Sequence, residues 1–233
     1  MSICNNCGYE GTGDYCSACG HVYVMKRITV GSIFHEVAHI FTHLEKGFGY
    51  TFKQLAIRPG LMQKEYLSGN RKRHQKPFSM LFLCATLAGL TFYWTSQSSE
   101  QSTSIQKATD EFSKHYYVIL QSLLLPFYTL VTWCLFRSKN FNYAEALVLF
   151  AYSLAFELIL MIPVNMINFI PGHFEISFVE IPVMTAYITW TNLKFFNSQS
   201  RWAVVLKSLL ILTICLFVSN VMANQFIHWM MHE

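Results

Sequence analysis

Four cysteines near the N-terminus have the spacing of a metal site. They form two C-x-x-C pairs, each followed by a glycine, and the ligands would be Cys4, Cys7, Cys16 and Cys19. A C-x-x-C turn places two thiolates on one side of a metal ion, and two such turns complete a tetrahedral site. We therefore predict a zinc ribbon over residues 1–21, with Zn²⁺ as a structural cofactor. Two disulfides are the alternative, which a cytoplasmic location would disfavour.

A second motif, HEVAH, supplies His35, Glu36 and His39. In zinc proteases two histidines one turn apart bind the metal, and the intervening glutamate acts as base toward the bound water. The same residues also form the polar face of an amphipathic helix predicted over residues 28–48. We favour the polar face, because the motif brings no third ligand, and keep a membrane-bound zinc metalloprotease as the minority interpretation.

Polar residues inside apolar stretches form the third candidate. Glu157 falls at the centre of its apolar run, and Asn165 follows in the same run. An ionisable group at that depth costs roughly 2.5 to 3.5 kcal/mol on insertion scales and marks a functional hypothesis. Alternatively, Glu157 is protonated and hydrogen-bonded between helices, while Glu145 and Glu180 lie near the interfaces.

The composition predicts that these candidates belong to a membrane protein. The 233 residues are 53% hydrophobic and only 13% charged, and the mean hydropathy is +0.31, which excludes an ordinary soluble domain. Five apolar runs are long enough to cross a bilayer; they cover residues 78–94, 116–136, 144–170, 176–193 and 202–227. We predict an all-α integral membrane protein with five transmembrane helices.

Basic residues before the first span predict the topology. Five of them are candidate membrane-surface residues: Arg58, Arg71, Lys72, Arg73 and Lys76. Such an excess holds its side in the cytoplasm and attracts an anionic inner leaflet. The loops that follow alternate between basic and base-poor, so we expect a cytoplasmic N-terminus and an exported C-terminus. Residues 1–21 contain no lysine or arginine, which argues against nucleic-acid binding by the ribbon.

The chain therefore divides into three parts. Residues 1–21 are the zinc ribbon, residues 22–77 are a cytoplasmic amphipathic and basic segment that we call the collar, and residues 78–233 are the transmembrane domain. The helix over residues 28–48 is expected to lie in the membrane interface. A second amphipathic piece over residues 50–57 is expected to stop at Pro59 and Gly60.

The collar also resembles a bacterial family of uncharacterised zinc-ribbon-headed membrane proteins. That family has R-I-T, G-F-x-x-T, P-G and Y-L-x-G-x-R before its first span, and the matching residues are 27–29, 47–51, 58–60 and 65–71. Residues 142–154 loosely resemble Yip1-type five-span proteins, although the proline expected after Tyr152-Ser153 is absent. The first resemblance implies a bacterial inner-membrane location and supplies no catalytic residues.

Three functions follow from these observations. The leading hypothesis is a membrane scaffold or adaptor whose ribbon contacts a cytoplasmic protein. The alternative is a small-solute or ion transporter, formed as a homo-oligomer around Glu157. The metalloprotease at HEVAH is the third.

Overall fold

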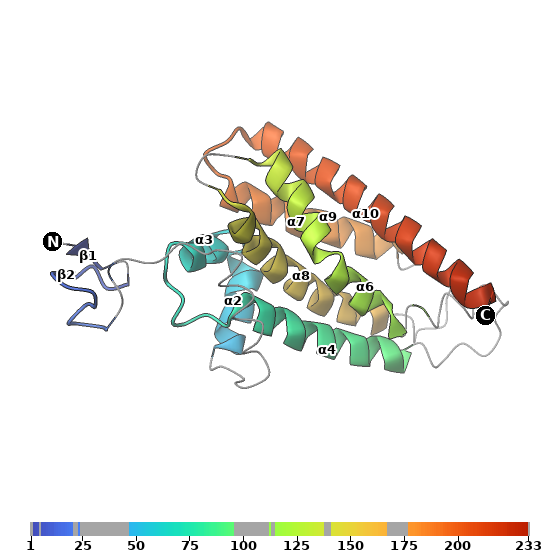
Figure 1. Ribbon diagram of the computed structural model, residues 1–233, viewed down its shortest axis with the longest axis horizontal. Helices are drawn as coiled ribbons and strands as arrows, with labels where there is room; N and C mark the ends of the chain where they lie inside the picture. The colour runs from blue at the N-terminus through green and yellow to red at the C-terminus, as the bar shows by residue number, and fades with distance from the viewer. Residues whose placement is uncertain are drawn as a thin grey trace.

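A computed structural model provides the fold, and it describes residues 2–4, 6–20, 23, 47–95, 112, 115–137, 141–166 and 177–232. The HEVAH residues His35, Glu36 and His39 lie outside the described residues, as does most of the helix predicted over residues 28–48. The rest is mostly helical, with a small ribbon at the N-terminal end of the molecule (Figure 1).

The N-terminal ribbon has very little regular structure. Strands β1 (Ser2–Ile3) and β2 (Glu10–Gly11) pair antiparallel, with Ser2 opposite Gly11 and Ile3 opposite Glu10. An isolated hairpin of this length is not stable in water. The ribbon therefore depends on the cysteine cluster described below.

Two short helices form the described part of the collar. Helix α2 (Phe48–Ile57) ends before Pro59 and Gly60 as predicted, and α3 (Leu61–Leu67), which the sequence analysis did not predict, begins directly after them. Both helices pack on the apolar bundle, α2 on helix α8 (Tyr143–Met166) and α3 on α8 and on helix α9 (Ser177–Phe195). Leu55 and Met62 are almost completely buried in these contacts.

The bundle itself consists of six helices within the described residues. They are α4 (Pro77–Thr95), α6 (Tyr117–Leu123), α7 (Leu125–Leu135), α8 (Tyr143–Met166), α9 (Ser177–Phe195) and α10 (Arg201–His232). Helix α8 lies between the others in Figure 1 and packs on α4, α7 and α9. It carries Ala151 and Ala155 four residues apart, and α4 carries Cys84 and Ala88; all four are fully buried. Small residues at this spacing allow helix backbones to approach closely in a membrane.

Three of these helices, α4, α8 and α10, are long and apolar enough to cross a membrane. Helices α6 and α7 form a fourth candidate span if the pair is counted as one, with a 44° bend between them. Pro126 explains the bend, because proline has no N–H to donate to the carbonyl one turn earlier. Helix α9 is not apolar enough to be counted with them, since Glu180, Asn192 and Lys194 lower its mean hydropathy. The structure thus supports three or four candidate spans, and the fifth stays a prediction.

Helix α10 is long, and much of its surface is apolar and exposed. Trp202, Leu206 and Phe217 each expose more than 60% of their surface. An exposed apolar face on a long helix is expected where lipid replaces water as the neighbour.

Gly60 joins the collar to the bundle. Its φ is +76°, and a Cβ atom there would lie 2.8 Å from the backbone nitrogen of Phe195 and closer still to the carbonyl oxygen of Thr191. The turn between α2 and α3 therefore approaches the end of α9 at a distance that only glycine permits.

We expect Gly60→Ala to destabilise the docked collar. The left-handed backbone costs a non-glycine residue about 1 to 2 kcal/mol, and overpacking costs about 1 to 3 kcal/mol. The apparent midpoint of thermal unfolding in detergent should fall. Gly49→Ala is the matched control, since no atom lies within 4 Å of a Cβ there and alanine favours a helix over glycine. An equal midpoint for the two variants would contradict the close contact.

Candidate functional site

The four predicted cysteine ligands come together in the structure. The Sγ atoms of Cys4 and Cys19 are 3.6 Å apart, as are those of Cys7 and Cys16. All four sulfur atoms lie within 4.8 Å of one another. These distances are too long for disulfides, in which the sulfur atoms are about 2.05 Å apart, and all four cysteines are free.

Each C-x-x-C turn is closed by the backbone in the same way. The N–H of Gly8 donates to the carbonyl oxygen of Cys4 at 2.9 Å, and the N–H of Gly20 donates to that of Cys16 at 2.7 Å. Both glycines have positive φ, 75° and 66°. The glycines therefore allow the chain to turn after the second cysteine of each pair.

The sulfur cluster fits a tetrahedral metal ion. With metal–sulfur bonds of about 2.3 Å, the ligands of a tetrahedral Zn²⁺ site are separated by about 3.8 Å, close to the 3.6 Å observed. Burial raises the pKa of Cys16, but hydrogen bonds from the backbone of Cys19 and Ala18 outweigh it and lower the pKa to about 6. A backbone hydrogen bond from Tyr9 lowers the pKa of Cys7, but hydrogen bonds with the neighbouring cysteine thiols outweigh it and raise the pKa to about 12. The cluster by itself thus favours the thiolate at Cys16 and the thiol at Cys7, and a bound metal ion would have to displace the remaining protons. The four cysteines could hold a metal ion.

Tyr23 packs against the cysteine cluster. Its ring is buried against Cys4 and Cys16, and its N–H donates to the carbonyl oxygen of Asp14 at 3.0 Å. An apolar shell of this kind limits access of water to the sulfur atoms.

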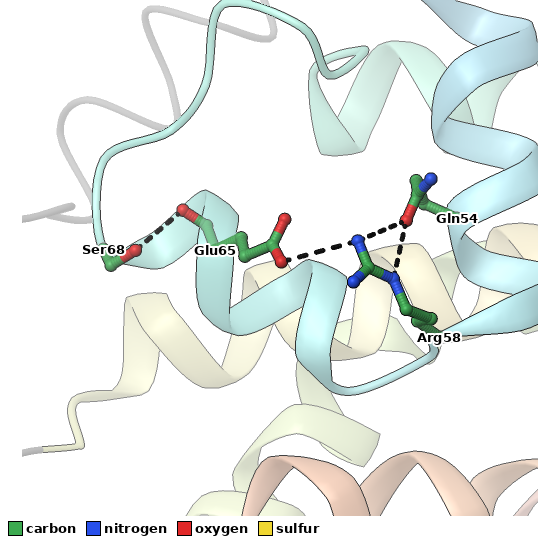
Figure 2. A network of polar contacts seen from close by, with 4 residues as sticks. All are labelled: Gln54, Arg58, Glu65 and Ser68. Carbon is green, nitrogen blue, oxygen red and sulfur yellow. Dashed lines mark hydrogen bonds and ion pairs between the residues drawn. The ribbon is translucent and has the colours of Figure 1, made fainter. Parts of the chain in front are cut away.

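Of the basic collar residues, Arg58 makes contacts with side chains of both collar helices. The Nε and Nη2 atoms of Arg58 each donate to Oε1 of Gln54 at 3.1 Å, and Nη2 lies 3.7 Å from Oε1 of Glu65 (Figure 2). The hydroxyl of Ser68 donates to the carbonyl oxygen of Glu65 at 2.9 Å. This network links α2 to α3 across the Pro59-Gly60 turn.

Two further bases are also engaged within the protein. Arg71 donates through Nε to the carbonyl oxygen of Tyr66 at 3.2 Å, and its Cζ atom lies 5.6 Å from the centre of the Tyr66 ring. Lys72 donates through Nζ to the carbonyl oxygen of Gly20 at 2.7 Å, which joins the collar to the ribbon. Arg73 is exposed and Lys76 half-buried. Binding of these five residues to anionic lipid stays a prediction.

His74 lies buried among the bases. Its side chain is 3% exposed, and its ring lies 5.3 Å from that of Tyr50 and 6.3 Å from that of Tyr66. Neither ring nitrogen has a hydrogen-bond partner among the described residues. Burial lowers the pKa of His74, Glu65 opposes that effect and Arg73 adds to it. Sequence reasoning missed this residue, because it lies within a polar, basic segment and no local pattern marks it as buried.

The lowered pKa predicts a loss of stability in acid. The unfolded chain takes up a proton at His74 near pH 6.5, whereas the folded chain does so only at lower pH. The stabilising contribution of neutral His74 is therefore present above about pH 6.5 and decreases below it. The unfolding midpoint in detergent should fall less steeply between pH 7.5 and 5.5 for His74→Phe than for wild type. Equal slopes for wild type and His74→Phe would refute the assignment.

Glu157 lines a cavity of about 340 Å³ that is partly open to the surface of the bundle. The side chain is 3% exposed, and its Oε1 atom has no hydrogen-bond partner among the described residues. Asn165 lies on the same helix, two turns further on, and its side chain is outside the described residues. The structure thus places one of the two predicted intramembrane residues in a cavity.

Glu180 lines the same cavity and was missed as a site residue. It lies near the start of an apolar run, so the sequence suggested an interfacial position. In the structure its Oε1 accepts a hydrogen bond from the hydroxyl of Tyr117 at 3.2 Å. Gln121 also lines the cavity. Its side-chain amide donates to the hydroxyl of Ser219 at 2.8 Å and accepts from the hydroxyl of Tyr128 at 2.9 Å. The Tyr117–Glu180 and Gln121–Ser219 contacts join residues 63 and 98 positions apart, so no local sequence signal could have revealed them.

Comparison with known proteins bears on part of the collar and on most of α4. Residues 45–89 match a family model described as "Protein of unknown function (DUF3667)". No curated protein and no solved structure matches the chain. The matched segment contains the Pro59-Gly60 turn and His74, and lies outside both the cysteine cluster and the cavity.

Proposed function

We propose that this chain is an integral inner-membrane scaffold or adaptor protein whose zinc-loaded ribbon contacts a cytoplasmic protein. The observation that carries the proposal is a four-cysteine cluster that holds together a small, exposed module with an apolar surface. Ile3 is 62%, Tyr9 49% and Tyr15 67% exposed. Tyrosines and aliphatic residues with this exposure are typical of the contact surfaces of protein partners.

The charge of the ribbon supports a protein partner rather than a nucleic acid. Its ionisable groups other than cysteine and tyrosine include Glu10 and Asp14, both exposed, and residues 1–21 contain no lysine or arginine. Phosphate backbones are bound chiefly by basic residues. A partner with a basic and apolar surface fits the ribbon better.

Zn²⁺ is the metal proposed for the cluster. Cys4, Cys7, Cys16 and Cys19 would hold it, and a closed site of four thiolates is typical of structural zinc. The ion would supply free energy of folding to a module whose two short strands cannot fold alone. No reaction is assigned to it.

The proposed topology has five spans. The three apolar helices and the bent α6–α7 pair supply four, and α9, a 19-residue helix, would be the fifth because its polar residues Glu180 and Asn192 face other helices. The basic residues of the collar would keep the N-terminus in the cytoplasm and α10 would lead to an exported C-terminus.

Zinc analysis of the detergent-purified protein tests the ribbon. We expect one zinc ion per wild-type chain, none in Cys4→Ser/Cys16→Ser, and one in Cys134→Ser, which removes an exposed cysteine of α7. His35→Ala/His39→Ala should also retain one. If zinc remains bound after the cysteines are replaced and is lost when the histidines are replaced, the metalloprotease hypothesis would be favoured over the scaffold.

Recovery of a partner tests the adaptor function. A protein that co-purifies with wild type should be lost from Cys4→Ser/Cys16→Ser and from Tyr9→Ser/Tyr15→Ser, with membrane insertion unchanged in both. Cys134→Ser should recover it fully. Equal recovery by all four proteins would contradict the adaptor proposal.

The cavity favours a second candidate function, transport of a small solute or ion. A buried acid beside a cavity between apolar helices is the arrangement found along substrate and ion pathways. Transport by a homo-oligomer would require Glu157, so Glu157→Gln should abolish any flux in liposomes. Absence of flux with wild type would rule this candidate out.

A further inference from the structure

We propose that the cavity around Glu157 and Glu180 binds an organic cation, a protonated amine or quaternary ammonium group carried on an apolar body. The proposal rests on the second candidate function for its physiological meaning. Binding and flux are measured separately below, so the site and the transport function can fail independently.

The charge of the cavity is the first step. Two carboxyl groups line it, and none of the described lining residues is a lysine, arginine or histidine. An ionised carboxylate is costly to bury unless an opposite charge accompanies it. The described wall supplies no such charge, so Glu157 is neutral by protonation unless a bound cation takes the place of the proton.

The hydrogen bonds of the wall distinguish the two acids. Glu180 accepts from the hydroxyl of Tyr117, and the amide of Gln121 is engaged at both ends, by Ser219 and Tyr128. In contrast, Oε1 of Glu157 is buried with no hydrogen-bond partner among the described residues. Glu157 is therefore the main group that a ligand would satisfy, with Glu180 as a second acid in the same wall.

The size and lining of the cavity favour an organic ligand over a bare metal ion. A volume of about 340 Å³ corresponds to roughly ten water molecules at about 30 Å³ each. Apolar side chains such as Leu154, Met184 and Leu212 form much of the wall. Tyr117, Tyr128 and Phe150 add aromatic faces, which attract ammonium groups. Among the described residues, no group of three His, Cys, Asp or Glu side chains that could hold a metal ion lies at this cavity, whereas an apolar cation matches both the charge and the surface of the wall.

Benzyltrimethylammonium is the probe, and isothermal titration calorimetry of the full chain in dodecyl maltoside measures its binding against protein-free micelles. We expect one saturable site in wild type and at least a tenfold loss of affinity in Glu157→Gln. Glu145→Gln is the matched control. It makes the same change on the same helix about 18 Å away, and glutamine can keep the capping bonds that Glu145 makes with Asn142.

The neutral carbon isostere neopentylbenzene tests whether charge matters. It has the same shape without the positive nitrogen, so it should bind wild type at least tenfold more weakly than the cation does. Its affinity for Glu157→Gln should equal its affinity for wild type. The proposal is overturned if wild type shows no saturable binding of the cation, if Glu157→Gln binds it as well as wild type does, or if the isostere binds as tightly.

A second measurement needs no variant and covers the case in which Glu157→Gln fails to fold. Dicyclohexylcarbodiimide modifies carboxyl groups in apolar surroundings, and mass spectrometry locates the modified residue. Benzyltrimethylammonium should protect Glu157 in wild type, and an unchanged rate of modification would refute the site. Saturable binding without flux into liposomes would uphold the site and contradict transport.

Discussion

The burial of helix α8 is the constraint on which the rest of the structure depends. This helix packs on α4, α7, α9 and both collar helices, and its residues from Ala144 to Leu158 are almost all buried. Ala151 and Ala155 allow close neighbours on one side. Because nearly every face of α8 is covered by protein rather than lipid, each surrounding helix is positioned by its contact with this one.

Two faces of α8 serve different parts of the molecule. Leu149 and Ser153 accept hydrogen bonds from Gln63 of the collar, at 3.4 and 3.3 Å, and the ring of Phe156 lies 5.3 Å from that of Phe52. Glu157 and Leu154 are on a neighbouring face and line the cavity. The residue that contacts the collar, Ser153, is thus one turn from the acid of the cavity.

The parts of the structure that depend on local spacing could be predicted from the sequence. The two C-x-x-C-G turns specify the cysteine cluster through backbone geometry alone, and a run of apolar residues is sufficient to predict α4, α8 and α10. The end of α2 follows from Pro59. In each case the decisive residues are within a few positions of one another.

The parts that depend on contacts across the chain could not be predicted. Helix α3 has a polar centre, and Gln63 is buried there only because α8 offers it acceptors. Glu180 becomes part of a cavity because Tyr117, 63 residues earlier, reaches its carboxyl group. His74 has no sequence feature that separates it from the exposed bases beside it. Its burial comes from Tyr50 and Tyr66 of the two collar helices.

Helix α10 is apolar and long enough to cross a membrane, and the proposed topology places the collar on the cytoplasmic side and the C-terminus on the exported side. Two single-cysteine reporters in a variant without native cysteines test it most directly, through labelling of intact cells with a membrane-impermeant maleimide. Ser198→Cys precedes α10, and Gln225→Cys lies 24 residues into it, about 36 Å further along, which exceeds the roughly 30 Å hydrocarbon core. If α10 crosses the membrane in this orientation, the residue 225 reporter is labelled in intact cells and the residue 198 reporter only after permeabilisation. Labelling of both from the same side would contradict it.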